Sequence, residues 1–60
     1  MNKQLMISAD EVAETLGVSM SYAYKVVRIL NKELEAKGFI TVAGRVSRRY
    51  FEEKFYGSED

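Results

Sequence analysis

The sequence contains no cysteine and no histidine, and these two absences remove much of the chemistry open to a small protein. Without cysteine the chain has no disulfides and no thiolate metal sites, which fits a reducing compartment. Without histidine it has no imidazole general base, no serine–histidine pair and no ordinary zinc site. We therefore expect neither a metal ion nor a bound cofactor.

Long apolar runs are also missing, although 47% of the residues are hydrophobic. No run approaches the length of a membrane span or a signal sequence, so we expect a cytoplasmic protein with no membrane association. A chain of 60 residues forms one domain, expected over residues 1–60 with frayed ends at 1–4 and 58–60.

Glycine is scarce, and its four copies are isolated from one another, so the chain has no glycine-rich phosphate loop. Carboxylates remain as candidate catalytic groups. The adjacent pairs Asp10-Glu11 and Glu52-Glu53, however, diverge on a helix surface instead of facing each other across a cleft. A core this small also leaves little volume for a substrate pocket, so we expect no enzyme and no small-molecule substrate.

The sequence does contain small and apolar residues at fixed offsets: Val12, Ala13, Gly17, Val18, Ala23 and Val26. Small side chains at Ala13 and Ala23 let two helices cross closely. Gly17 is suited to the left-handed conformation that ends a helix. This spacing predicts a helix-turn-helix, and the second helix of such a pair is the usual reader of a DNA major groove.

Capping signals define where both helices begin. Ser8 to Glu11 forms a capping box, with Ile7 and Val12 as a hydrophobic staple, which predicts a first helix over Ala9–Leu16. Ser19 caps the second helix, which is predicted to continue to about Lys37.

Opposite faces of the second helix differ in character when residues are projected at about 100° each. The core face carries Ala23, Val26, Val27, Leu30 and Leu34. The opposite face carries Ser21, Lys25, Arg28 and Lys32. Tyr24 borders this basic stripe, whereas Tyr22 and Ile29 share the other flank.

A small hairpin is predicted to follow the second helix. Phe39–Val42 and Arg45–Ser47 are expected to pair through a three-residue loop from Val42 to Gly44. In this arrangement Ile40 faces Val46 on the inner side, and Thr41 and Arg45 point outward.

A short helix then follows, capped by Ser47 and spanning Arg48 to Phe55, with Phe51 and Phe55 on an aromatic face. The expected fold is mainly α with a small β-hairpin. Its order is helix, turn, long helix, hairpin wing and short helix, which is a winged helix-turn-helix.

The net charge of zero conceals a separation of charge along the chain. Residues 20–49 carry seven basic and two acidic side chains, a net charge of +5, and the remaining residues carry −5. The molecule should therefore be dipolar, with one face suited to phosphate.

Two stretches of the sequence carry a family resemblance. Ser8-Ala-Asp-Glu-Val-Ala-Glu-Thr-Leu-Gly-Val-Ser19 is followed by a tyrosine-bearing helix and then by Gly44-Arg-Val-Ser-Arg-Arg-Tyr-Phe-Glu52. This order resembles the small winged helix-turn-helix proteins of the excisionase and MerR-like group, and the likeness extends from Ile7 to Tyr56. The second helix is longer than is usual for that group.

The resemblance implies a bacterial or phage protein of a mobile element that binds double-stranded DNA. It would act as an excisionase, an architectural factor that bends DNA beside a recombination site so that a separate integrase favours excision, or as a local transcription regulator. Homodimers or several copies side by side on DNA are implied as well, because a single module of this size covers little DNA.

The expected DNA contacts form two groups. From the second helix, base edges and flanking phosphates would be met by Ser19, Met20, Ser21, Tyr24, Lys25, Arg28 and, at the periphery, Lys32. From the wing and the following helix, phosphates or the minor groove would be met by Thr41, Arg45, Arg48 and Arg49.

A protein-interaction module without direct DNA contact is the alternative interpretation. The basic stripe would then face water. Another chain would dock on the flank with Tyr22 and Ile29 or on the edge with Phe39.

Overall fold

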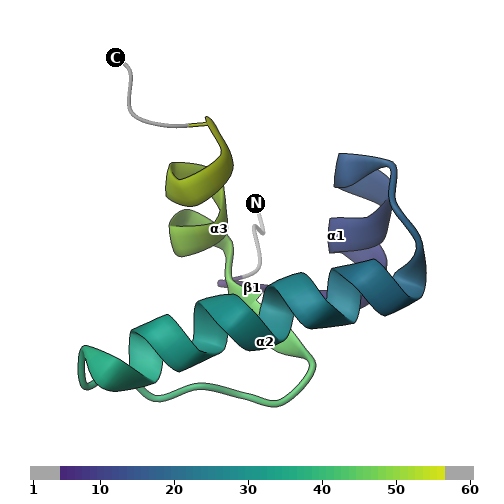
Figure 1. Cartoon of the computed structure of the whole chain (residues 1–60). Coiled ribbons are helices and arrows are strands. Elements are labelled where there is room, and N and C mark those ends of the chain that lie inside the picture. Colours follow the sequence, from purple (N-terminus) through teal and green to yellow (C-terminus); the bar gives the residue numbers. More distant parts are fainter. Residues whose placement is uncertain (1–4, 57–60) are drawn as a thin grey trace.

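The structure is a computed structural model that describes residues 5–56, so the expected fraying of 1–4 and 58–60 lies outside the described residues. Its elements are β1 (Met6–Ser8), α1 (Ala9–Leu16), α2 (Met20–Ala36), β2 (Arg45–Ser47) and α3 (Arg48–Tyr56). The long helix α2 crosses the molecule, and α1 and α3 both stand on one side of it (Figure 1). The predicted class, mainly α with a small β element in the order of a winged helix-turn-helix, is confirmed.

Helix α1 begins and ends where its signals predict. The Ser8 hydroxyl accepts the Glu11 amide at 3.5 Å, and the two staple residues, Ile7 and Val12, are both buried in the core. The Glu11 carboxylate, which a capping box directs back to the Ser8 amide, instead pairs with Arg48 at 3.3 Å. The cap therefore also ties the start of α1 to the start of α3.

The turn between α1 and α2 depends on Gly17, whose φ of +69° lies in the left-handed region. Its amide donates to the Ala13 carbonyl at 2.8 Å, which closes α1. Two residues later the Ser19 hydroxyl accepts the Tyr22 amide at 3.2 Å and so starts α2. The predicted helix-turn-helix is confirmed at both caps.

The core lies between the apolar stripe of α2 and the elements above it. All five predicted stripe residues are buried. Around them the core is completed by Ile7, Ala9, Val12, Val46 and Phe51. Because these come from β1, α1, β2 and α3, every element contributes to one hydrophobic cluster.

The predicted strand pairing was wrong. Strand β2 pairs antiparallel with β1, with Ile7 opposite Val46, and residues 39–41 form no strand. The Ile40 side chain, expected on the inner face, is 94% exposed. The reason is competition for one partner: Ile7 is fixed beside Val46 by the start of α1, so it occupies the inner position predicted for Ile40.

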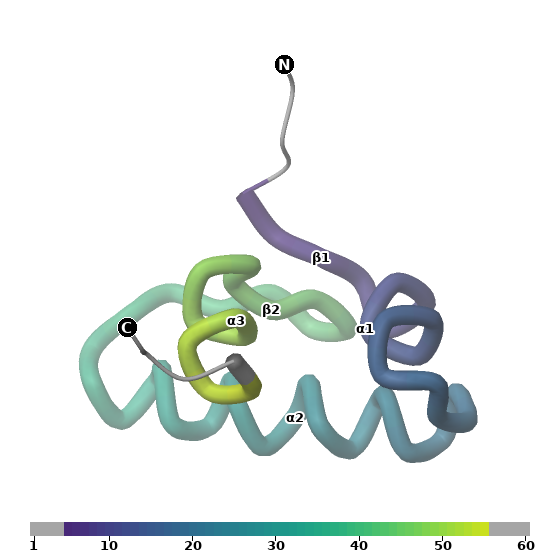
Figure 2. The backbone as a smooth tube through the Cα atoms, turned by 90° about the horizontal axis from the view of Figure 1, so that it is seen from above, coloured from purple at the N-terminus to yellow at the C-terminus, as the bar shows by residue number. Residues whose placement is uncertain are grey.

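The loop before β2 is also shorter than predicted. The Arg45 amide donates to the Val42 carbonyl at 3.1 Å, which leaves two central residues, Ala43 and Gly44, instead of three. Gly44 has a φ of +80°, the left-handed value that the third position of a type II turn requires. We call Val42–Arg45 the wing turn, and Figure 2 shows the segment that leads to it running back alongside α2.

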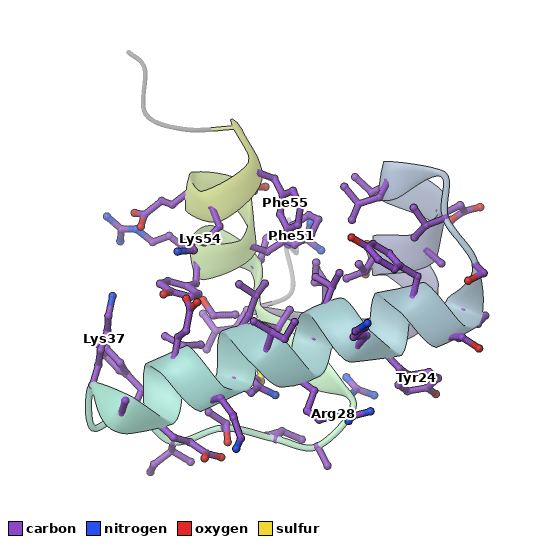
Figure 3. All side chains as sticks on the ribbon, in the orientation of Figure 1. Tyr24, Arg28, Lys37, Phe51, Lys54 and Phe55 are labelled. Atoms are coloured by element: carbon purple, nitrogen blue, oxygen red, sulfur yellow. The ribbon has the colours of Figure 1, made fainter. Side chains whose placement is uncertain are left out.

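Helix α3 packs on the core through one of its two phenylalanines. Ser47 accepts the Tyr50 amide at 3.2 Å and caps the helix as predicted. Phe51 is buried, whereas Phe55 is 44% exposed and packs against it with the two rings tilted and their centroids 4.9 Å apart. Both rings extend from α3 towards the side where α1 stands (Figure 3). Among residues 5–56, no helix is long and apolar enough to cross a membrane.

Candidate nucleic-acid interface

A groove of about 430 Å³ lies between the outward side of α2 and the wing turn with the residues before it. It is lined by Tyr24, Val27, Arg28, Asn31, Lys32, Glu35, Thr41, Ala43 and Gly44. Tyr24 and Arg28 lie on the side of α2 that faces away from α1 and α3 (Figure 3). The structure thus brings the basic stripe of α2 and the wing turn together on one side of the molecule.

The cationic face of α2, which we define as Lys25, Arg28 and Lys32, is exposed, and so is Arg45 in the wing turn. None of the ion pairs formed among residues 5–56 involves any of these four side chains. Unneutralised cations on one surface attract polyanions. This surface is therefore the strongest candidate for phosphate binding in the described part of the chain.

Cations elsewhere in the structure have partners. Arg48 pairs with Glu11 at 3.3 Å, and Arg49 pairs with Glu53 at 3.6 Å while its side chain remains 89% exposed. Neither arginine lines the groove. The two predicted α3 contacts thus differ from the cations of α2 in that each already has a carboxylate partner.

Lys37 and Lys54, the remaining cations of residues 5–56, gather around Tyr50. Lys54 lies 3.3 Å from Glu33, and the Lys37 ammonium lies 4.9 Å from the centroid of the Tyr50 ring. Figure 3 shows Lys37 and Lys54 on the side of α2 where α3 stands. These charges stabilise the packing of α3 instead of facing the groove.

Tyr50 also forms the shortest link between α3 and α2. Its hydroxyl donates to Glu33 at 2.6 Å. This hydrogen bond, with help from Lys54, holds the pKa of Glu33 below its usual range, and the same bond raises the pKa of the Tyr50 phenol. The pair is a neutral phenol on a carboxylate, and it joins α3 to α2.

Four other predicted contacts lie at the start of α2 and in the groove lining. Ser19, Met20 and Ser21 are exposed at the start of α2, where the side chains of a recognition helix reach bases. Thr41 lines the groove, and its hydroxyl donates to the Glu35 carboxylate at 2.7 Å. Thr41 is therefore placed beside a negative charge.

Asn31 is a residue that the sequence reasoning missed. Its amide nitrogen donates to the carbonyl oxygens of Val42 at 3.1 Å and Arg45 at 2.7 Å, so it joins α2 directly to the wing turn. The signal that points to it is an amide following Leu30 at the border of the apolar stripe, where a purely structural helix would carry an apolar residue.

Several large apolar side chains remain exposed outside the groove. Tyr22 and Ile29 are each about half exposed, and Phe39 and Ile40 are more so. A second hollow, of about 470 Å³, adjoins Phe39 and Ile40 and also includes Lys37 and Arg49. Within residues 5–56, no three potential ligand side chains come together as a metal site.

Comparison with known proteins shows similarity to an excisionase. The chain is 34% identical over 47 residues to the ICEBs1 excisionase of Bacillus subtilis (strain 168), and the match covers 78% of this chain and 73% of that protein. No protein-family model matches the sequence, and no solved structure matches it. Because the identity extends over most of both chains, this protein belongs to the excisionase family.

Proposed function

We propose that this protein binds double-stranded DNA and acts as the excisionase of a bacterial mobile element. The observation that carries the proposal is a set of exposed cations, Lys25, Arg28, Lys32 and Arg45, that form no ion pair among residues 5–56. Arg28 and Lys32 line one groove together with residues of the wing turn. In this role the outward face of α2 enters the major groove and the wing turn lies over the adjacent backbone or minor groove.

Base readout in the proposal falls to the first half of α2. Arg28 is the leading candidate, because a guanidinium donates two hydrogen bonds to guanine in the major groove. Lys25 and Tyr24 flank it, and Ser19, Met20 and Ser21 occupy the end of the helix that enters the groove first. Lys32 lies beyond these residues and meets backbone phosphate.

The phosphate contacts proposed outside α2 differ in whether a carboxylate already contacts the side chain. Arg45 projects from the wing turn without a carboxylate partner among residues 5–56, and it is the main contact there. Arg48, Arg49 and Thr41 stay in the proposal as secondary contacts. For each of them a phosphate would have to replace or share an existing carboxylate interaction, which lowers the gain in free energy on binding.

Duplex binding is tested by fluorescence anisotropy over a series of salt concentrations. Contact with four to six phosphates gives a slope of log affinity against log salt of about −4 to −5. Arg28→Glu should abolish most of the binding, whereas Lys37→Glu, a matched reversal on the opposite side of α2, should leave most of it. Equal effects of the two reversals, or no binding at low salt, would refute the proposed surface.

Excision and transcriptional control use the same DNA contacts, so the two roles are distinguished by measuring recombination and promoter activity in cells. We propose that the protein, in several copies side by side or as a dimer, directs a separate integrase towards excision. The test measures the junction of the excised element in cells with and without the protein. Restoration by the wild-type chain but not by Arg28→Glu supports excision. An unchanged junction with a changed promoter output supports a transcription regulator.

A docking module for another protein is the second candidate, and the exposure of Phe39 and Ile40 beside a hollow favours it. In that case Phe39→Ser and Ile40→Ser would abolish the biological output while Arg28→Glu left it intact. The duplex-binding experiment above decides between the two functions, because a docking module of this kind shows almost no salt-dependent affinity for DNA.

A further inference from the structure

Asn31 is the one buried polar side chain recorded among residues 5–56, with 8% of its surface exposed. It lies on α2 between Val27 and Leu34, one turn from each, and both neighbours are in the core. Burying an amide among apolar side chains costs free energy unless its polar atoms find partners. The partners of Asn31 therefore explain what this position contributes.

Both partners belong to the wing turn. The Asn31 amide nitrogen donates to the Val42 carbonyl at 3.1 Å and to the Arg45 carbonyl at 2.7 Å, and the Val42 carbonyl also accepts the Arg45 amide at 3.1 Å. From the other side, the Ala9 amide at the start of α1 donates to the Gly44 carbonyl at 3.2 Å. Three carbonyls of a four-residue turn are thus held by two different helices.

The side chain is only half satisfied in this position. Its carbonyl oxygen is buried without a hydrogen-bond partner among the described atoms. A leucine, whose side chain branches in the same way, would remove that unsatisfied oxygen and extend the apolar stripe, so apolar burial alone does not favour asparagine here. Departures from local packing preference of this kind are expected at functional positions.

We infer that Asn31 is a positioning residue that holds Arg45 at a fixed place beside the cationic face of α2, so that helix and wing turn meet DNA as one rigid surface. This inference rests on the proposed function. Arg28 lies one helical turn before Asn31 on α2, and Arg45 accepts the Asn31 hydrogen bond through its own carbonyl. The Asn31 side chain therefore connects the helix that carries Arg28 directly to the backbone of Arg45. A preorganised turn loses less conformational entropy on binding than a mobile one.

A double-mutant cycle in duplex affinity tests the inference. Arg45→Ala is expected to weaken binding about tenfold, equivalent to about 1.4 kcal/mol. Asn31→Leu should cause a similar loss because it releases the turn that carries Arg45. The double variant should then bind no more than about twofold more weakly than Asn31→Leu alone. Losses that multiply to about a hundredfold, or full affinity in Asn31→Leu, would overturn the inference.

Two further variants separate positioning from a general loss of stability. Val26→Ala removes core volume from the same helix without touching the wing turn, and Arg45→Ala should still cost the full factor of about ten in that background. Asn31→Ser, whose short side chain cannot reach both carbonyls, should reproduce Asn31→Leu if the leucine variant folds poorly.

Amide hydrogen exchange gives a readout that is independent of DNA. In Asn31→Leu the Arg45 amide should exchange at least about tenfold faster, while the Leu30 amide within α2 is unchanged. Unchanged exchange at Arg45 overturns the inference whether or not the protein binds duplex. If the wild-type chain itself fails to bind duplex, the proposed function fails, and the exchange measurement still decides whether Asn31 holds the turn.

Discussion

Two isoleucines offer the sharpest test of the fold, because sequence pattern and structure assign them opposite environments. Ile7 is 3% exposed in β1 and Ile40 is 94% exposed before the wing turn. A hairpin of 39–42 with 45–47 would bury Ile40 against Val46, whereas the structure places Ile7 opposite Val46. The same substitution, isoleucine to alanine, at both positions therefore distinguishes the two arrangements.

The structure predicts that Ile7→Ala and Ile40→Ala lower the free energy of unfolding by amounts that differ several-fold. Truncating a buried isoleucine to alanine costs about 2–5 kcal/mol, from lost apolar burial and the cavity left behind. An exposed side chain changes stability by no more than about 0.5 kcal/mol. A chain of 60 residues has a total stability of about 3–9 kcal/mol, so Ile7→Ala should remove a large part of it. Its melting temperature should fall by at least about 8 °C.

Urea unfolding followed by circular dichroism measures both variants against the wild type. We expect a much lower midpoint for Ile7→Ala and an unchanged midpoint for Ile40→Ala, with similar slopes. If Ile7→Ala is fully unfolded, Ile7→Val should still lower stability by about 0.5–1.5 kcal/mol. Equal destabilisation at the two positions would refute the observed strand pairing.

Three further predictions follow from single contacts. Gly17→Ala should lower the free energy of unfolding, measured by urea titration, by about 1 kcal/mol, because alanine is strained in the left-handed conformation of this position. A Cβ there meets no atom within 4 Å, so no steric clash adds to this loss. Tyr50→Phe should lower the urea midpoint near neutral pH, and the difference should shrink as the pH falls below 4.5, because a carboxylate with a lowered pKa stabilises the fold only while ionised. A constant difference between pH 7 and pH 3 would contradict this assignment. Lys32→Gln should reduce the salt slope of duplex binding by about 1 for any DNA sequence, whereas Lys54→Gln, on the opposite side of α2, should leave the slope unchanged.

Local signals in the sequence were sufficient for the helices. Ser8, Gly17, Ser19 and Ser47 each act on residues within four positions, so the start or end they predict can be read from the local sequence alone. The apolar stripe of α2 was equally predictable, because helical periodicity alone selects its five members.

Strand pairing was not predictable in the same way, because it depends on which of two segments reaches Val46. Phe39–Val42 is nearer in sequence and more β-prone, which favours a hairpin. The staple at the start of α1 positions Ile7 instead, and that constraint becomes visible only when the helices are packed. Asn31 was missed for a related reason, since its partners lie 11 and 14 residues away.

The candidate DNA contacts also divide into those that follow from the local sequence and those that depend on the packing of distant segments. Lys25, Arg28 and Lys32 were predicted from one helix, and the structure leaves them exposed and unpaired among residues 5–56. Arg48 and Arg49 were predicted from charge and chain order. The pairing of Arg48 with Glu11 depends on how α3 docks beside α1, which the sequence does not specify. The pairing of Arg49 with Glu53 is a local contact four residues apart within α3.

The central claim is that DNA meets the face formed by α2 and the wing turn, and an NMR titration of the labelled protein with a short duplex tests it most directly. We predict the largest amide shifts over residues 20–32 and 42–45, with little change over 10–14 in α1 and 50–55 in α3. Shifts concentrated in α1 and α3, with the outward face of α2 unchanged, would contradict the account.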